Sequence, residues 1–476
     1  MTTLHLAHDD VRDLRVGDRR ILFHVPTSGL FEMDELSGEL LDLFAELGGV
    51  GEEDVRKRFE GRVDPARVAE TLRELMTLRI IDEGLPKPGR KPIEIEQFPL
   101  STVVLNVNTG CNLSCTYCYK EDLTTPAKGE RMEFETAARS VDLLFQEAAS
   151  RESVNVVFFG GEPLTNLPLI REVVAYAEEK GKAAGKRVDF SLTTNAVLLT
   201  EEIVDWLDEH RFGITVSMDG PKPLHDRNRK TVGGKGSYDV VAAKARMLLA
   251  RYRSRPVGAR VTLTAGVTDV VGIHNHLKDE VGFFEVGFSP VTSGAVSLFN
   301  LSGDELAEVF EGMKALGRVY VDAAKRGENV GFANMHQLMT DLTEGTSKAL
   351  PCGAGLGMLA VDKAGDLHLC HRFAGSKQPT YGNVDTGIEK ESLGAFLEGM
   401  ANRTGTACET CWIRKLCAGG CYHESYARYA DPAHPTYHYC NLMRDWIDFG
   451  IGAYAEIMVA NPDFFERHVA PRRAKS

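Results

Sequence analysis

Two kinds of segment are missing from this 476-residue sequence. No run approaches the about 20 apolar residues of a membrane-spanning helix, and the opening residues MTTLHLAHDD lack the basic and apolar regions of a signal peptide. We therefore expect a cytoplasmic protein with no membrane partner. Basic residues are not in excess either, because the formal net charge is −13. This charge argues against a nucleic-acid partner, since phosphate binding needs a basic surface.

Cysteine is absent from the first 110 residues. The ten cysteines fall into two groups, three within residues 111–118 and seven between residues 352 and 440. Because the cytoplasm keeps thiols reduced, this distribution indicates metal binding more than disulfides. Hydrophobic residues make up 43% of the chain and charged residues 26%, which is ordinary for a globular protein. The length suggests about two to four domains.

The N-terminal part, residues 15–85, predicts a small domain of its own. A short strand is expected at 20–25 and a helix at 36–47, where apolar residues recur at helical spacing. A further helix begins at Asp64-Pro65, a side-chain cap followed by proline at the first helical position. With a last strand at 79–81, the order suggests a winged-helix shape. The proline-rich residues 86–99 predict a linker.

The central part, residues 100–325, alternates between strand and helix patterns. Helices are expected at 134–149, 168–184 and 201–209, and strands at 103–107, 154–159, 188–192, 213–217, 257–263 and 285–288. Six such units predict an α/β fold with parallel strands, a partial (β/α)6 barrel. A cysteine-rich domain at 326–450 and a C-terminal helix and tail at 451–476 are expected to follow.

The first cysteine group lies directly after the first barrel strand, where catalytic loops of such folds are found. Cys111, Cys115 and Cys118 have the spacing Cys-x3-Cys-x2-Cys, with Tyr117 before the last thiol. Three thiolates on one loop suit three corners of a [4Fe–4S] cluster and leave the fourth iron open for chemistry. Chance cysteines and part of a zinc site are the alternatives.

This loop resembles the cluster loop of the radical S-adenosylmethionine (SAM) enzymes. The resemblance implies that SAM chelates the open iron, and that its reductive cleavage gives a 5′-deoxyadenosyl radical. Gly160-Gly161-Glu162-Pro163 follows the second strand and resembles the family segment that holds the amino group of SAM. Paired glycines allow close approach of the backbone to a ligand, and a glutamate can pair with an ammonium group.

Polar residues after the next two strands extend the resemblance. Asn195 ends a segment like the Thr-Asn-Gly of the family, although Ala196 replaces the glycine. The resemblance places Ser217 near the ribose and carboxylate of SAM, and Arg229 is also assigned to SAM. Asp219 is the candidate for a catalytic group that moves a proton from the substrate, but a function that only shapes the turn is favoured over it.

The second cysteine group resembles the SPASM extension of radical SAM enzymes, which holds two auxiliary [4Fe–4S] clusters and so implies three in all. Its pattern is Cys352-x12-Gly365-x4-Cys370, then Cys408-x2-Cys411-x5-Cys417-x3-Cys421, then Cys440. The resemblance implies one cluster on Cys408, Cys411, Cys417 and Cys440, and a second on Cys352, Cys370 and Cys421. Zinc is the alternative for these cysteines.

The second of these auxiliary sets has three cysteines, one fewer than a closed cluster needs. Met358 lies in the region where some relatives carry a further cysteine. The cluster is then either open, in which case it is able to bind a substrate thiolate, or closed by Asp362, Asp366 or His368.

The whole layout is similar to radical SAM/SPASM maturases that modify peptides. It is most like those that form Cys-to-Asp or Cys-to-Glu thioether cross-links in the small subunit of quinohemoprotein amine dehydrogenase. The resemblance implies a peptide or small-subunit partner docked on the N-terminal domain as an added strand, and an external electron donor. A purely structural N-terminal domain, an anaerobic sulfatase maturase that makes formylglycine, and an iron–sulfur DNA-binding regulator are the alternatives.

Overall fold

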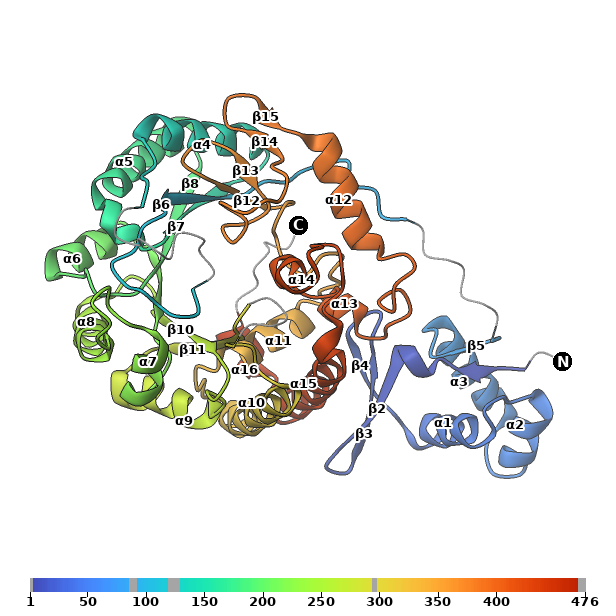
Figure 1. Ribbon diagram of the computed structural model, residues 1–476. Coiled ribbons are helices and arrows are strands. Elements are labelled where there is room, and N and C mark those ends of the chain that lie inside the picture. Colours follow the sequence, from blue (N-terminus) through green and yellow to red (C-terminus); the bar gives the residue numbers. More distant parts are fainter. Residues whose placement is uncertain (1–2, 85–91, 119–128, 293–297, 470–476) are drawn as a thin grey trace.

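The computed structural model describes residues 3–84, 92–118, 129–292 and 298–469, so part of the predicted linker lies outside the described residues. Its centre is an eight-stranded sheet in the order β11-β10-β9-β8-β7-β6-β12-β13 (Figure 1). The six predicted barrel strands are β6 (Thr102–Asn108), β7 (Ser153–Gly160), β8 (Arg187–Thr194), β9 (Gly213–Ser217), β10 (Gly258–Leu263) and β11 (Glu285–Pro290). All neighbouring pairs among them are parallel, which confirms the predicted mostly parallel α/β fold.

Helices cover the outer side of this curved sheet (Figure 1). They are α4 (Phe134–Glu147), α5 (Leu167–Ala184), α6 (Glu201–Glu209), α8 (Tyr238–Arg251), α9 (Val270–Asn275) with the following π-helix η4 (His276–Val281), and α10 (Gly303–Lys325). The short helix α7 (Lys222–Asn228) follows the carboxyl end of β9 instead. In β7, buried residues alternate with half-buried ones, because successive side chains of a strand point to opposite faces. Val156 and Phe158 therefore join the core, and the other face of the sheet is left concave and partly accessible.

The cysteine-rich region is not separated from the barrel. β12 (Met358–Val361) pairs in parallel with β6, and β13 (Leu367–His368) pairs antiparallel with β12. The sheet thus continues past the predicted boundary at residue 325, because Leu359 and Val361 are buried in the same core as β6. The remaining elements are α11 (Ala333–Thr343), β14 (Gly382–Asn383), β15 (Gly387–Ile388), α12 (Lys390–Asn402), α13 (Arg414–Cys417), α14 (Tyr422–Tyr429), η5 (Tyr437–Tyr439), α15 (Cys440–Ala460) and α16 (Asp463–His468). The predicted boundary at 450 falls inside α15, which packs along α10.

The N-terminal unit (blue in Figure 1) has two small sheets and three helices. They are β1 (His5–Leu6), η1 (His8–Asp10), β2 (Val11–Val16), β3 (Arg19–His24), β4 (Gly29–Glu32), α1 (Glu35–Leu47), α2 (Glu52–Phe59), α3 (Pro65–Thr77) and β5 (Ile81–Asp82). The carboxylates of Asp34 and Asp64 cap α1 and α3, as expected of this residue type. The unit begins before residue 15, because β1 pairs with β5 and β2 with β3.

This N-terminal unit is packed firmly onto the rest of the chain. Leu22 of β3 lies in the core of the unit, whereas the neighbouring Phe23 is fully buried in the core of the main body. On β2, the Arg12 guanidinium carbon lies 3.6 Å from the ring centroid of Trp412, and Arg12 Nε is 3.2 Å from a carboxylate oxygen of Asp448 on α15. The β2 side of the sheet is therefore covered, and within the described ranges β4 pairs only with β3. No helix of the described residues is long and apolar enough to cross a membrane.

Candidate active site

The loop with Cys111, Cys115 and Cys118, here the cluster loop, leaves the carboxyl end of β6 and is held on two sides. On the first side it touches the paired glycines that follow β7. A Cβ on Gly160 would lie 2.2 Å from the carbonyl oxygen of Asn108, and one on Gly161 would lie 2.1 Å from that of Gly110. The amide of Gly161 donates to Asn108 O at 2.7 Å. Only glycine allows this backbone contact, and Gly160 also has a φ of +144°.

Glu162 joins the ends of β7 and β8 beneath this contact. Its side chain is buried and accepts hydrogen bonds from Leu164 N at 3.1 Å, Thr194 Oγ1 at 2.8 Å and Asn195 N at 2.7 Å. Burial raises the pKa of Glu162 to about 7 despite these three donors. The structure thus shows protein groups around the carboxylate, and its pairing with a ligand ammonium stays a prediction.

Asn195 brings the end of β8 to the first thiol. Its Nδ2 lies 2.8 Å from Asn112 Oδ1 and 3.8 Å from Cys111 Sγ. The next residue, Ala196, is buried with a φ of +66°. This left-handed conformation explains why the matching segment of the family carries glycine, since an L side chain costs about 1–2 kcal/mol there.

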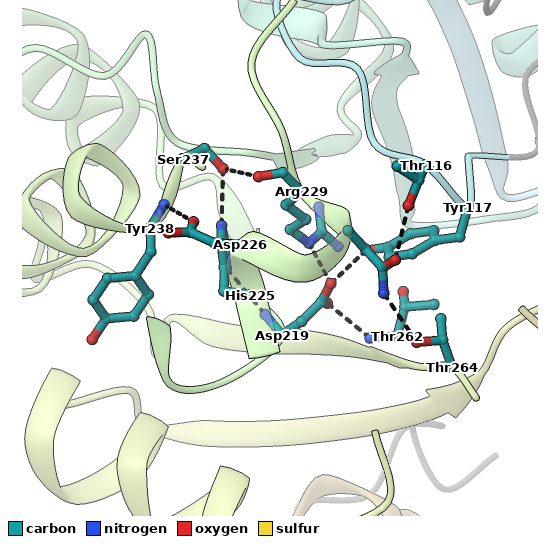
Figure 2. Close-up of polar contacts among 11 residues, drawn as sticks. Thr116, Tyr117, Asp219, His225, Asp226, Arg229, Ser237, Tyr238, Thr262 and Thr264 are labelled. Carbon is teal, nitrogen blue, oxygen red and sulfur yellow. Dashed lines mark hydrogen bonds and ion pairs between the residues drawn. The ribbon is translucent and has the colours of Figure 1, made fainter. Parts of the chain in front are cut away.

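On its second side the cluster loop is docked against the segment that ends α7. Ser114 N donates to Lys230 O at 2.7 Å, and Thr116 N donates to Asn228 O at 2.9 Å. The Thr116 hydroxyl donates to Asn228 Oδ1 at 2.8 Å, and Asn228 in turn donates to Thr264 Oγ1 at 3.0 Å. The loop is therefore anchored through α7 to the end of β10 (Figure 2).

Asp219 is the centre of the buried network that Figure 2 shows. One carboxylate oxygen accepts from Tyr117 Oη at 2.7 Å and from Arg229 Nε at 2.8 Å, and the other accepts from Thr262 N at 3.0 Å. Asp219 is 2% exposed. Because protein groups donate to both oxygens, this geometry favours the turn-shaping function over proton transfer to a substrate. Arg229, expected at SAM, is itself buried and paired with Asp219.

A neutral histidine completes the network. The amide of Asp219 donates to Nδ1 of His225 at 3.4 Å, so Nε2 carries the proton that it shares with Ser237 Oγ at 3.0 Å. The Ser237 hydroxyl then donates to the carbonyl oxygen of Arg229 at 2.8 Å. Burial and the nearby Arg229 charge lower the pKa of His225 to about 4. His225 and Ser237 were not among the predicted site residues, although the polar run after β9 was a signal for them.

The thiols of Cys111, Cys115 and Cys118 are soft ligands of the kind that suits an iron–sulfur cluster. Burial raises the pKa of Cys111 to about 12 and that of Cys115 to about 11, and for Cys115 the Arg229 charge opposes this effect. Thiolates are the ligands of iron–sulfur clusters, so metal binding here must displace protons. Ser217, the last predicted residue of this group, ends β9 half-buried and pairs with Arg260 of β10 on the concave face.

The seven C-terminal cysteines lie in two groups, and their assignment to clusters stays a prediction. One cavity is lined by all of Cys408, Cys411, Cys417 and Cys440. In the described part of the chain, no three His, Cys, Asp or Glu side chains converge closely enough for a single metal ion. Thiols spread around a cavity instead suit a cluster, which offers each of them a different corner.

Cys352, Cys370 and Cys421 form the other set. Burial raises the pKa of Cys370 to about 12, and the charges of the other two thiols add to the shift, so the three lie near one another. Met358 adjoins the set, because its amide donates to Gly353 O at 2.9 Å.

The three residues considered as further ligands of that set have partners of their own. Asp362 and His368 pair with each other at 3.1 Å, and Asp366 accepts from Asn383 Nδ2 at 2.9 Å. None of these contacts involves a thiol of the set.

Comparison with known proteins finds one matching family model and several similar proteins. Residues 105–270 match the radical SAM superfamily model. An uncharacterized protein of Archaeoglobus fulgidus is 28% identical over 350 residues, covering 70% of this chain and 76% of that protein. A serine-type anaerobic sulfatase-maturating enzyme of Klebsiella aerogenes is 23% identical (77% and 94% covered), and a cysteine-type enzyme of Clostridium perfringens is 23% identical (74% and 96% covered).

Two solved structures have a similar fold. Native anSMEcpe with bound AdoMet superposes with a TM-score of 0.64 at 21% identity, covering 76% of this chain and 100% of that one. Streptococcus suis SuiB bound to its precursor peptide SuiA superposes with a TM-score of 0.50 at 16% identity, covering 90% and 98%. The cluster loop, the paired glycines and the Asp219 network all lie inside the residues that match the radical SAM superfamily model.

Proposed function

We propose that this chain is a radical SAM enzyme that modifies a peptide or small protein by forming thioether bonds. The best candidate is the small subunit of quinohemoprotein amine dehydrogenase, with links from Cys sulfur to side-chain carbons of Asp or Glu. The observation that carries the proposal is that the ten cysteines form three sets: one on the loop after β6, one that lines a single cavity, and one in which the charges of two thiols act on Cys370.

Each set has a function in this proposal. Cys111, Cys115 and Cys118 hold a [4Fe–4S] cluster that, with SAM and an external one-electron donor, supplies the 5′-deoxyadenosyl radical. The backbone at Gly160 and Gly161, with Asn195 and Ser217, borders the space for SAM. The Tyr117–Asp219–Arg229 network would keep the loop in place, so that its three thiols could hold the cluster.

The proposed reaction replaces one C–H and one S–H bond of the peptide by one C–S bond. The carbon loses a hydrogen atom, which leaves as 5′-deoxyadenosine, and the thiol loses a proton to solvent. SAM also yields methionine. One electron enters from the donor to cleave SAM, and one electron leaves when the C–S bond forms.

The two auxiliary clusters of the proposal give that second electron an exit, which brings the cofactors to three [4Fe–4S] clusters and SAM. The set of Cys352, Cys370 and Cys421 offers three thiols, with Met358 beside Cys352. We infer that this cluster keeps one open iron for the substrate thiolate. Met358→Cys is expected to close it, preserving iron content while abolishing cross-linking.

The N-terminal unit supports a peptide substrate. Its β2 side is covered by the main body, whereas β4 is a sheet edge to which an extended peptide can add as a strand. The fold similarity to SuiB spans 90% of the chain, whereas anSMEcpe is covered entirely and still leaves about a quarter of this chain unmatched.

Formylglycine formation is the second candidate, because the sulfatase-maturating relatives match over 94–96% of their own lengths. Its product is an aldehyde, which reacts with hydrazides, whereas a thioether does not. A DNA-binding regulator is the distant alternative. An assay in which the protein cleaves SAM to 5′-deoxyadenosine would exclude DNA binding as its main function.

Anaerobic co-expression with the small subunit tests the proposal. Intact and tandem mass spectrometry should show loss of two hydrogens per linked pair, with links mapped from Cys to Asp or Glu. A Cys115→Ala variant serves as the control and should leave the subunit unmodified. An unchanged subunit beside a wild-type enzyme that cleaves SAM refutes this substrate, and a hydrazide-reactive sulfatase peptide supports the second candidate.

A further inference from the structure

An arginine, Arg260, lies on the concave face of the sheet. Arg260 of β10 is in register with Ser217 of β9 and with Gly287 of β11. In β10 the alternate residues Val261 and Leu263 are buried in the core, so Arg260 is on the opposite, concave face. Its Nη1 lies 3.2 Å from the position that a Cβ on Gly287 would take. Glycine at this position therefore leaves room for the guanidinium to extend across β11.

Arg260 is exposed on the concave face of the sheet. The side chain is accessible to solvent, yet surrounding protein desolvates it enough to lower its pKa, and the charge of Arg372 lowers that pKa further. Across the described ranges, no carboxylate pairs with Arg260. Charged side chains in such positions normally have a counter-ion.

Arg372 reaches this place from the cysteine-rich region. It follows His371, whose ring lies 3.9 Å from that of Phe159 at the end of β7. Phe159 is half-buried, on the face of β7 opposite the core residues Val156 and Phe158. The loop after Cys370 is thus inserted into the concave face, and it carries a second guanidinium toward Arg260.

Two guanidinium groups that lie near each other repel, so an anion that contacts both of them is held favourably. A carboxylate suits the planar fork of donors on each arginine, and such charge-assisted hydrogen bonds are strong. The same loop carries Cys370 of the three-thiol set, so a carboxylate held here lies close to the place proposed for the substrate sulfur.

We propose that Arg260, together with Arg372, binds the side-chain carboxylate of the Asp or Glu that is modified and so determines which residue is attacked. This inference rests on the proposed thioether function. The same chemistry would also suit the carboxylate of SAM, since Ser217 is adjacent, and the test separates the two sources.

The test compares Arg260→Gln and Arg260→Lys with Arg246→Gln, an exposed position on the outer helix α8. Each variant is reconstituted, checked for iron content, titrated with SAM, and assayed on the small subunit and on versions with Asn or Gln at the attacked positions. Arg260→Gln should lower kcat/KM for cross-linking about 10- to 100-fold, the range expected for lost charge-assisted hydrogen bonds. Its Kd for SAM should stay within about twofold of wild type, and Arg260→Lys should recover part of the loss.

Coupling between the arginine and the carboxylate is the decisive result. Changing both the enzyme (Arg260→Gln) and the substrate (Asp to Asn) should cost no more than either change alone, because each removes the same contact. Cross-linking by Arg260→Gln equal to that by Arg246→Gln overturns the inference. A tenfold weaker Kd for SAM in Arg260→Gln assigns the carboxylate to SAM and also overturns it. A wild-type enzyme that leaves the subunit unchanged removes the proposed function, and the inference with it.

Discussion

Replacing Asp219 by asparagine should loosen the cluster loop. Asp219 and Arg229 form a buried ion pair with a 2.8 Å contact, and their side chains are 3% and 9% exposed. Asparagine keeps an acceptor for Thr262 N, but its amide group then faces the N–H of Arg229 and the hydroxyl of Tyr117. Removing one partner of a buried ion pair costs about 3–5 kcal/mol, because the other charge is left uncompensated.

Hydrogen exchange measures this cost locally, without requiring two-state unfolding of a multidomain metalloprotein. At about 1.4 kcal/mol per tenfold, the amides of Ser114, Thr116 and Thr262 should exchange about 10²- to 10⁴-fold faster in Asp219→Asn. The spectrum of the first cluster should change with them. An additional Arg229→Met change should restore part of the protection, since a buried ion pair can often be replaced by apolar groups.

The control is Asp205→Asn, at an exposed position on α6 that pairs with Arg251. It should leave exchange of the three amides unchanged. If Asp219→Asn also left exchange and the cluster spectrum unchanged while it stopped cross-linking, Asp219 would act on the substrate directly as a catalytic group. That result would refute the positioning argument.

Three further predictions follow from the same geometry. Gly161→Ala should lose the iron of the first cluster, because the new Cβ would lie 2.1 Å from the carbonyl oxygen of Gly110; Gly303→Ala, with nothing within 4 Å, should keep full iron content. Glu162 holds a proton in the folded chain that the unfolded chain releases between pH 4.5 and about 7, so wild-type stability should fall by about 3 kcal/mol as pH rises across this window. Thermal unfolding from pH 4.5 to 7.5 should show a falling midpoint in wild type that is absent in Glu162→Gln, and a flat wild-type profile contradicts the assignment. Cys411→Ala should lower iron from about twelve to about eight atoms per chain, whereas unchanged iron would mean that this cavity holds no cluster.

The elements of the barrel were predictable because their signals are local. Apolar alternation and helical spacing located the strands and helices to within a few residues, and the loop after the first strand was expected to be functional. By contrast, β12 is short, and its pairing with β6 joins residues 256 apart in the sequence, such as Met358 and Thr102. A local pattern does not reveal such a partner.

The sequence also did not reveal the partners of individual side chains. From the sequence, Asp219 is an acidic residue that follows a strand. Only the structure shows that Tyr117, Arg229 and Thr262 donate hydrogen bonds to it. Phe23 reads as one more apolar residue of a small domain, yet it is buried in the core of the main body.

By itself, the sequence determined the chemistry available to this protein: the thiol spacing of the cluster loop, the paired glycines and the second cysteine set are all written in short segments. Only the tertiary structure decided how that chemistry is oriented. In the folded chain, Asp219 is bonded to Arg229 inside a buried network. Cysteines that are distant in the sequence line one cavity. Arg260 and Arg372 lie close enough for the charge of one to act on the other. The reason is physical. Residue types and spacing set which groups can bind or react, whereas burial, pairing and charge environment depend on which distant segments pack together.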